Sequence, residues 1–146
     1  MLSSQHLRSL LVLVLLFAAA GCNNGSSSPT APDQSAVAYS ATDLTVGTGV
    51  EATPGTTASV QYGGWLYSAN ATDHKGQQFQ ASQLSYLVGS TQLIKGFDMG
   101  VTGMKVGGTR RVIIPPSLGF GATGSSDGTI PPNAALVFDI LLVSVQ

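Results

Sequence analysis

Alternating apolar and polar residues predict three β-strands along the chain. In residues 57–67, apolar side chains alternate with polar or small ones, which is typical of a half-buried strand. Gly63 and Gly64 lie within this segment and indicate a bulge or a close approach of another part of the chain. Residues 110–114 are rich in β-branched side chains and predict a second strand. Residues 135–145 are apolar at both alternating sets of positions, which predicts a central strand with both faces largely covered.

One further segment has the spacing of a helix. Its apolar residues follow one another at i, i+3, i+7 and i+10, and they are Ile94, Phe97, Val101 and Met104. Three glycines interrupt the segment, and each costs about 1 kcal/mol relative to alanine in a helix. We therefore expect a short helix that depends on packing for its stability. Together these elements predict an α+β fold in which the helix covers one face of the sheet.

Residues 1–21 have the layout of a signal peptide. Arg8 precedes an apolar run over residues 10–20, and this run is shorter than the roughly 20 residues that cross a bilayer as a helix. The small residues just before Cys22 resemble the lipobox of bacterial lipoproteins, in which the cysteine becomes the lipidated first residue of the mature chain. Lipidation of Cys22 is therefore expected, and plain secretion is the alternative.

The polar stretch after Cys22 has no apolar periodicity and predicts a flexible tether over residues 22–38. A folded domain is then expected over residues 39–146. Acyl chains stabilise membrane attachment by about 0.8 kcal/mol per buried CH₂, so a lipidated Cys22 implies a membrane anchor. We accordingly expect an exported lipoprotein at the periplasmic face of the outer membrane or at the cell surface.

Composition excludes several classes of function. The chain has 146 residues, with six basic and seven acidic side chains and a net charge of -1. Because Lys and Arg are not clustered, the chain lacks the electrostatic surface that binds nucleic acid. One cysteine and two distant histidines supply neither an internal disulfide nor a zinc site. No metal and no cofactor are expected.

Residue patterns for nucleophilic or acid-base catalysis are nearly absent. The serines lack a histidine partner apart from His74, which stands in a polar segment and is interpreted as solvated. The glycine-rich residues 119–124 lack the strand, the helix and the lysine of a nucleotide-binding loop. An aromatic set remains, and most of it is interpreted as core, although aromatic grooves also bind proline. This set consists of Tyr62, Trp65, Tyr67, Phe79, Tyr86, Phe97, Phe120 and Phe138.

Three segments, in this order and at these spacings, resemble the FKBP-type peptidyl-prolyl cis-trans isomerases. They are VQYGGWL at residues 60–66, QLIKGFDMGV at 92–101, and FGATG at 120–124 continuing through IPPNAALVFD at 130–139. The resemblance runs from about Leu44 to Gln146. It implies a twisted antiparallel sheet of five or six strands wrapped around one short helix. It also implies cis-trans isomerisation of X-Pro bonds in proline-containing polypeptides.

The resemblance also implies an aromatic substrate pocket. Phe97 would form its floor, where the family usually has Trp, and the Ile94 backbone N–H would bind the ligand carbonyl. The implied catalytic residues are Tyr62, Phe79, Phe97, Phe120 and Phe138, and the implied substrate-binding residues are Gln80, Leu93, Ile94 and Ile130.

Two further positions depart from the family pattern. Gln80 stands where an Asp is common, and Phe120 stands where a Tyr is common. These changes predict reduced isomerase activity and weakened binding of macrolide inhibitors such as tacrolimus or rapamycin. An alternative remains open, namely a non-catalytic or weakly active proline-binding module or chaperone that uses the same groove.

Overall fold

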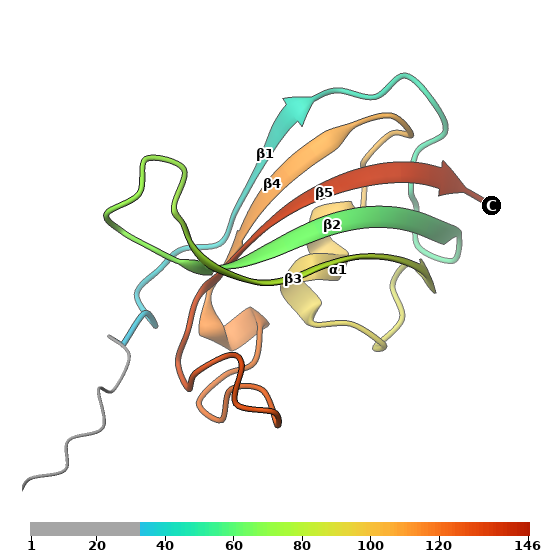
Figure 1. Cartoon of the computed structure of the whole chain (residues 1–146). Coiled ribbons are helices and arrows are strands. Elements are labelled where there is room, and N and C mark those ends of the chain that lie inside the picture. The colour runs from blue at the N-terminus through green and yellow to red at the C-terminus, as the bar shows by residue number, and fades with distance from the viewer. Residues whose placement is uncertain (1–32) are drawn as a thin grey trace, which may run out of the picture.

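The computed structural model describes residues 33–146, which form one five-stranded antiparallel sheet and one short helix (Figure 1). The spatial order of the strands is β1-β4-β5-β2-β3, so β1 and β3 are the edges and β5 is central. In chain order the elements are β1 (Ser40–Thr45), β2 (Thr57–Tyr67), β3 (Lys75–Leu87), α1 (Lys95–Val101), β4 (Thr109–Ile114), the 3₁₀ turn η1 (Pro116–Leu118) and β5 (Leu136–Val145). The predicted signal peptide, Cys22 and the first part of the predicted tether lie outside the described residues.

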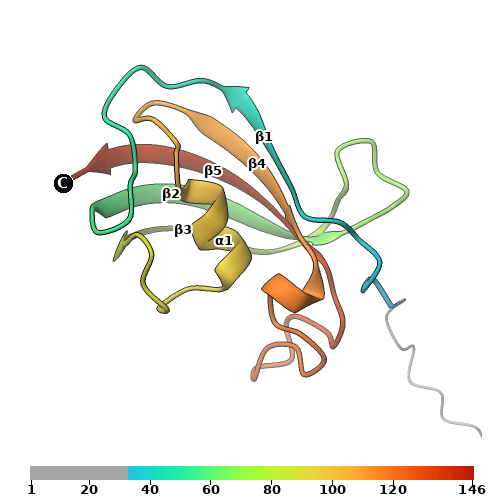
Figure 2. The same ribbon diagram turned by 180° about the vertical axis from the view of Figure 1, so that it is seen from behind.

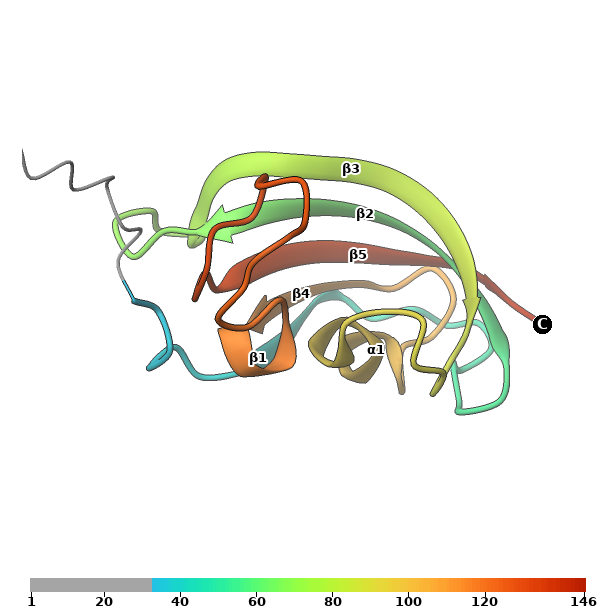
Figure 3. The same ribbon diagram turned by 90° about the horizontal axis from the view of Figure 1, so that it is seen from below.

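The three strands expected from the alternating pattern are confirmed as β2, β4 and β5. β5 is the central strand, and its residues that face α1 are buried from Leu136 to Leu142. The prediction that both of its faces are largely covered is wrong for its second half, because Val143 is 39% exposed on the outer face. In residues 33–146 the helix lies on the opposite face of the sheet, as Figures 2 and 3 show, and no second layer of these residues covers the outer face.

α1 packs on the concave face of the sheet, and its glycines make this close packing possible (Figure 3). A Cβ atom added at Gly96 would lie 2.5 Å from Ile114 Cγ2, and one added at Gly100 would lie 2.6 Å from Val112 Cγ2. Both contacts are too short for real atoms, so the glycines let the helix backbone approach β4. The helix is shorter than the apolar spacing indicates, since it ends before Gly103, which has φ +80°.

The folded part of the chain begins before the predicted boundary at residue 39. The Gln34 side chain donates a hydrogen bond to the Tyr67 carbonyl at 3.1 Å and accepts one from the Ala135 amide at 2.8 Å. It thereby joins the end of β2 to the residue before β5. Gln34, which falls within the predicted tether over residues 22–38, thus contacts the domain, and a polar side chain with backbone partners gives no periodic apolar signal that would reveal this. No helix in the described part of the chain is long and apolar enough to span a membrane.

His74 differs from its interpretation as a solvated loop residue. Its ring stacks on Tyr67 with the centroids 5.1 Å apart, and its Nδ1 atom is buried. The residue takes a left-handed backbone conformation with φ +58° and ends the turn that leads into β3. The aromatic neighbour on β2 therefore holds this loop against the sheet.

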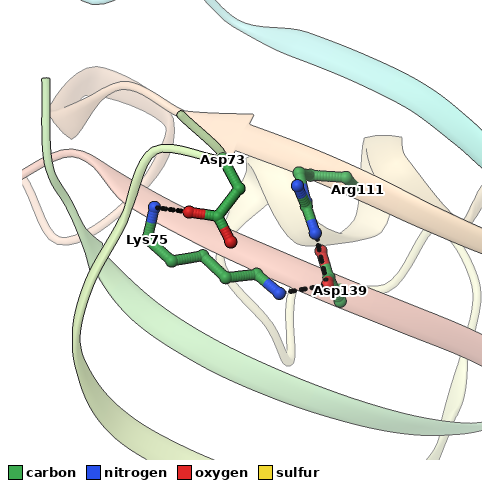
Figure 4. A network of polar contacts seen from close by, with 4 residues as sticks. All are labelled: Asp73, Lys75, Arg111 and Asp139. Carbon is green, nitrogen blue, oxygen red and sulfur yellow. Dashed lines mark hydrogen bonds and ion pairs between the residues drawn. The ribbon is translucent and has the colours of Figure 1, made fainter. Parts of the chain in front are cut away.

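A polar network on the outer face joins β3, β4 and β5 (Figure 4). Asp139 accepts two hydrogen bonds from Arg111, at 2.7 and 2.8 Å, and one from Lys75 Nζ at 2.5 Å. The Lys75 ammonium also lies 4.0 Å from the centre of the Trp65 ring. Burial alone would raise the pKa of Asp139, but the hydrogen bonds from Arg111 and Lys75 outweigh it and lower the pKa below its ordinary value.

Replacing Asp139 by Asn should lower the free energy of unfolding by about 1 kcal/mol at pH 7, because the ionic hydrogen bonds are lost. A carboxylate with a depressed pKa stabilises the fold above its unfolded pKa, and this contribution disappears as pH falls through the folded value. The difference between wild type and D139N should therefore be full at pH 7 and shrink below roughly pH 4. Urea unfolding at several pH values measures this. A difference that stays constant down to pH 2 would contradict it.

Candidate active site

A pocket of about 240 Å³ opens on the concave side of the sheet, beside α1 and the segment between η1 and β5. Its walls come from β2, β3, β5, the start of α1 and Phe120, which follows η1. The lining residues are Tyr62, Phe79, Gln80, Leu84, Gln92, Leu93, Ile94, Phe97, Phe120 and Phe138. None of them is charged, so within the described residues this pocket offers aromatic and aliphatic surface with a few neutral polar groups.

Phe97 forms the bottom of the pocket. Its ring is only 4% exposed and makes edge contacts with Tyr62, at 5.4 Å between centroids, and with Phe138, at 5.3 Å. Tyr86 supports it from the core at 6.3 Å. Rings that meet edge to face gain about 0.5–1.5 kcal/mol beyond the apolar area they bury. The floor is therefore fixed from three sides by rings on β2, β3 and β5.

Gly64 makes room for the two aromatic side walls. The Phe79 and Phe138 rings meet edge to face at 5.7 Å. A Cβ atom on Gly64 would lie 2.7 Å from Phe79 Cζ and 2.8 Å from Phe138 Cε1. On the other face, the Trp65 ring lies over Gly63. The close approach that the Gly63-Gly64 pair indicates is thus observed, and a register shift follows directly after Gly64.

The Ile94 backbone amide is available at the rim. Ile94 is the residue before α1, with φ -59° and ψ 140°, and its carbonyl accepts hydrogen bonds from the Phe97 and Asp98 amides. Within the described part of the chain, its own N–H makes no hydrogen bond to protein. A donor at the edge of an apolar pocket can orient a ligand carbonyl without adding charge.

The tyrosine hydroxyls around the pocket stay neutral at physiological pH. Burial raises the pKa of Tyr62. Burial also raises the pKa of Tyr86, and the neighbouring Asp98 charge raises it further. Among the described residues that line the pocket, none is therefore poised for proton transfer near pH 7, which disfavours acid-base chemistry.

The segment between η1 and β5 is shaped by backbone constraints. Gly121 and Gly124 have φ +64° and +71°. A Cβ atom on Gly124 would lie 2.3 Å from the Ile130 carbonyl oxygen. The Ser125 amide donates to that same carbonyl, and the Ile130 amide donates to the Ser125 hydroxyl at 2.8 Å. These bonds close the segment into a compact loop that holds Phe120 at the pocket.

Comparison with known proteins decides the family. A model described as FKBP-type peptidyl-prolyl cis-trans isomerase matches residues 49–143. The chain belongs to this family. Membership makes it a peptidyl-prolyl cis-trans isomerase, and it confirms the family resemblance and the predicted antiparallel sheet with one helix.

Relatives of different lengths share this FKBP-type domain. An FK506-binding protein of Neisseria meningitidis is 42% identical over 103 residues, which are 70% of this chain and 92% of the relative. FK506-binding protein 3 of Candida albicans is 41% identical over 104 residues, 71% of this chain, but these are only 23% of that protein. The chain therefore spans nearly all of one relative and about a quarter of the other.

Two solved structures have the same FKBP-type fold. FkpA from Escherichia coli matches with a TM-score of 0.62 and 30% identity, over 77% of this chain and 50% of that chain. A peptidyl-prolyl cis-trans isomerase from Pseudomonas syringae matches with a TM-score of 0.62 and 29% identity, over 79% of this chain and 82% of that one.

The structure brings eight of the nine predicted FKBP-type site residues to one pocket. The exception is Ile130, which is buried and borders a neighbouring hollow together with Phe79, Gln80 and Phe120. Two lining residues, Leu84 and Gln92, were not among the predicted ones. Leu84 pairs with the buried Val60 in the sheet, so recognising β3 as a strand would have found it.

Proposed function

We propose that this FKBP-type isomerase accelerates X-Pro isomerisation in exported polypeptides by holding the bond in the uncharged aromatic pocket. The observation that carries the proposal is the pocket lining, in which four aromatic rings surround the floor residue Phe97 and no side chain is charged. Pro-containing ligands fit such grooves because their rings are apolar and their backbone is already restricted.

The proposed mechanism needs no acid, base or nucleophile. Rotation about an amide faces a barrier of about 18–20 kcal/mol because resonance gives the C–N bond partial double-bond character. The planar amide carries more separated charge on oxygen and nitrogen than the twisted form does. A preformed apolar pocket stabilises the twisted amide relative to the planar one, which lowers the barrier.

The Ile94 amide would orient the substrate in this mechanism. It lies next to the pocket rim and has no protein acceptor among the described residues. Donation to a substrate carbonyl would hold the chain while Phe97 and Tyr62 contact the proline ring. Positioning of this kind contributes to the rate because the reacting bond enters the pocket in one orientation.

A proline-peptide assay tests the proposal. In a protease-coupled assay, the purified protein should accelerate the slow cis-to-trans phase in proportion to its concentration. Activity no higher than that of a folded Tyr62→Ala, Phe97→Ala double variant would refute catalysis by this pocket. Circular dichroism of the double variant checks that its fold is retained.

Restoring the two departing residues should raise the activity. Phe120→Tyr adds a hydroxyl at the pocket wall, and one net hydrogen bond of about 0.5–1.5 kcal/mol corresponds to roughly a two- to tenfold gain in kcat/KM. Gln80→Asp restores a charge at the same wall and should act in the same direction. Binding of tacrolimus or rapamycin, measured by calorimetry, should tighten in parallel. Unchanged kcat/KM in both variants would show that neither position limits the activity.

The proposed cellular context rests on the leader sequence and Cys22. A lipidated Cys22 would anchor the domain at the periplasmic face of the outer membrane or at the cell surface, where exported clients fold. The full-length protein should partition into the detergent phase after expression in a bacterium that processes lipoproteins, and Cys22→Ser should move it to the aqueous phase. Partitioning that persists in C22S would contradict the anchor.

Gln80 and Phe120 favour a second candidate, a binding module or chaperone that uses the same groove with little turnover. Both positions lie at the pocket wall, and both lack groups common in the family. Refolding of a client whose slow step does not involve proline separates the two functions. Improved recovery of that client without peptide turnover would support the chaperone.

A further inference from the structure

The two edges of the sheet are built differently. β3 has 13 residues and forms one edge, and β1 has six residues and forms the other. An edge strand exposes a row of backbone N–H and C=O groups that can pair with another strand, so proteins protect their edges with charges, prolines, bulges or short strands.

The β1 edge is protected in this way. The strand is short, and its register with β4 breaks between Asp43 and Thr45. Asp43 also forms a two-point ion pair with Arg110, at 2.6 and 3.1 Å. A partner strand approaching β1 would meet a charged pair and an irregular backbone.

The β3 edge lacks this protection. From Gly76 to Ile94 the sequence contains no charged residue and no proline. Residues 80–87 pair with β2 in unbroken register, from Gly64 with Gln80 to Thr57 with Leu87. Within the described part of the chain, the sheet places no strand on the other side of β3. Figure 3 shows β3 as the outermost strand, with its end curving toward the side of the sheet on which α1 lies.

Two polar side chains of residues 80–87 contact β2, and the Ser82 hydroxyl donates a long hydrogen bond to the Gln83 carbonyl of β3 itself at 3.5 Å. Ser85 Oγ lies 2.6 Å from Ser59 Oγ, and Gln61 Nε2 donates to Gln83 Oε1 at 3.3 Å. Most side chains of residues 80–87 are exposed, whereas Leu84 and Tyr86 turn toward the core. Within the described part of the chain, the outward backbone groups of residues 80–87 therefore have no strand partner, and no side chain among these residues is charged.

We propose that the outer edge of residues 80–87 adds an extended segment of the substrate polypeptide as a further strand beside the proline pocket. This inference rests on the proposed function. Gln80 and Leu84 belong to both the edge and the pocket lining, so the chain that flanks a bound proline passes directly along β3. Backbone pairing is independent of sequence, and an uncharged edge repels neither acidic nor basic clients.

Peptide length and backbone chemistry test this edge. The wild-type protein is assayed with a tetrapeptide containing Leu-Pro and with a 16-residue peptide that carries the same Leu-Pro in an uncharged Thr- and Val-rich sequence. Loss of a few backbone hydrogen bonds corresponds to about a tenfold change in kcat/KM. The long peptide should therefore exceed the tetrapeptide by about that factor, and N-methylation of alternate amides flanking the proline should abolish the gain. Equal kcat/KM for the two peptides, or a gain that survives N-methylation, would overturn the proposal.

Variants on the protein complete the test. Adjacent residues of a strand direct their N–H groups to opposite edges. Of the two variants Ser82→Pro and Gln83→Pro, one therefore loses a hydrogen bond to β2, and the other loses an N–H donor on the outer edge. Urea unfolding identifies the outward position as the more stable variant, and this variant should lose the long-peptide gain. Gln83→Lys should reduce the gain as well, whereas the matched Thr42→Lys on the β1 edge should keep it. A long-peptide gain in kcat/KM that persists in both the outward proline variant and Gln83→Lys would overturn the proposal.

Two further outcomes are distinguishable. If neither peptide is turned over, the proposed catalysis fails. Fluorescence anisotropy of a labelled 16-residue peptide then still measures whether the peptide binds to the β3 edge. Binding that N-methylation abolishes would support the edge, and binding that is indifferent to it would overturn it. A concentration-dependent dimer in light scattering that the outward proline variant dissociates would also overturn the proposal, because a second copy would then occupy β3.

Discussion

Replacing Phe97 by Ala is expected to reduce kcat/KM by about a hundredfold and to lower the free energy of unfolding by about 3–5 kcal/mol. The ring is 4% exposed and contacts Tyr62, Phe138 and Tyr86 edge to face. Its removal leaves a cavity beneath the substrate, releases two wall rings and admits water to the pocket floor. Proline-peptide kinetics and urea unfolding measure the two effects.

Met99→Ala is the matched control, because Met99 lies on the same helix and is 43% exposed. Surface substitutions of this kind usually change stability by less than about 0.5 kcal/mol. Phe97→Leu, which keeps part of the volume, should lose less activity than F97A. If folded F97A retained wild-type kcat/KM, Phe97 would be core alone and the pocket would not be the site of catalysis.

The sequence indicates the buried half of the sheet and misses its edges. β2 and β4 bury one face each, so their alternation is visible in the sequence, and β5 is visible as a run that is apolar at both alternating sets of positions. Every residue of β1 is exposed, and β3 is exposed over most of its length. Polar strands of this kind are held by backbone pairing with a neighbour, which leaves no apolar period to read. The family resemblance predicts a sheet with more strands than these three, whereas the residues of β1 and β3 show no strand pattern of their own.

The site was predictable as a list of residues but not as a cavity. Nothing in the local sequence separates a core ring such as Tyr86 from a pocket ring such as Phe79, since both are aromatic residues in one strand. The difference arises from Gly64, whose missing side chain lets two rings tilt toward each other across the sheet. Ile130 is the opposite case, a predicted pocket residue that does not line the pocket. Its amide donates to the Ser125 hydroxyl, and the residue borders the neighbouring hollow instead.

Helix propensity alone predicts that the glycines weaken α1, but the packing of α1 on β4 reverses this effect at Gly96. In an exposed helix, Gly→Ala would stabilise by about 0.5–1 kcal/mol. At Gly96 the added Cβ would lie 2.5 Å from Ile114 Cγ2 and 3.0 Å from Cγ1, and both atoms belong to a fully buried side chain. Overpacking of a buried contact costs about 1–3 kcal/mol, which exceeds the gain in helix propensity. We therefore expect Gly96→Ala to destabilise the protein by about 1–2 kcal/mol in urea unfolding.

The same variant should lower kcat/KM, because Gly96 lies between the floor residue Phe97 and the amide donor Ile94. Relief of the clash shifts α1 away from β4, and both groups move with it. A double-mutant cycle with Ile114→Ala isolates this contact, since I114A removes the atoms that the new Cβ would strike. The combined loss of stability should be smaller than the sum of the single losses by about 0.5–2 kcal/mol. Additive losses, or a stabilised G96A, would mean that α1 is free to adjust and that its glycines do not set the position of the pocket floor.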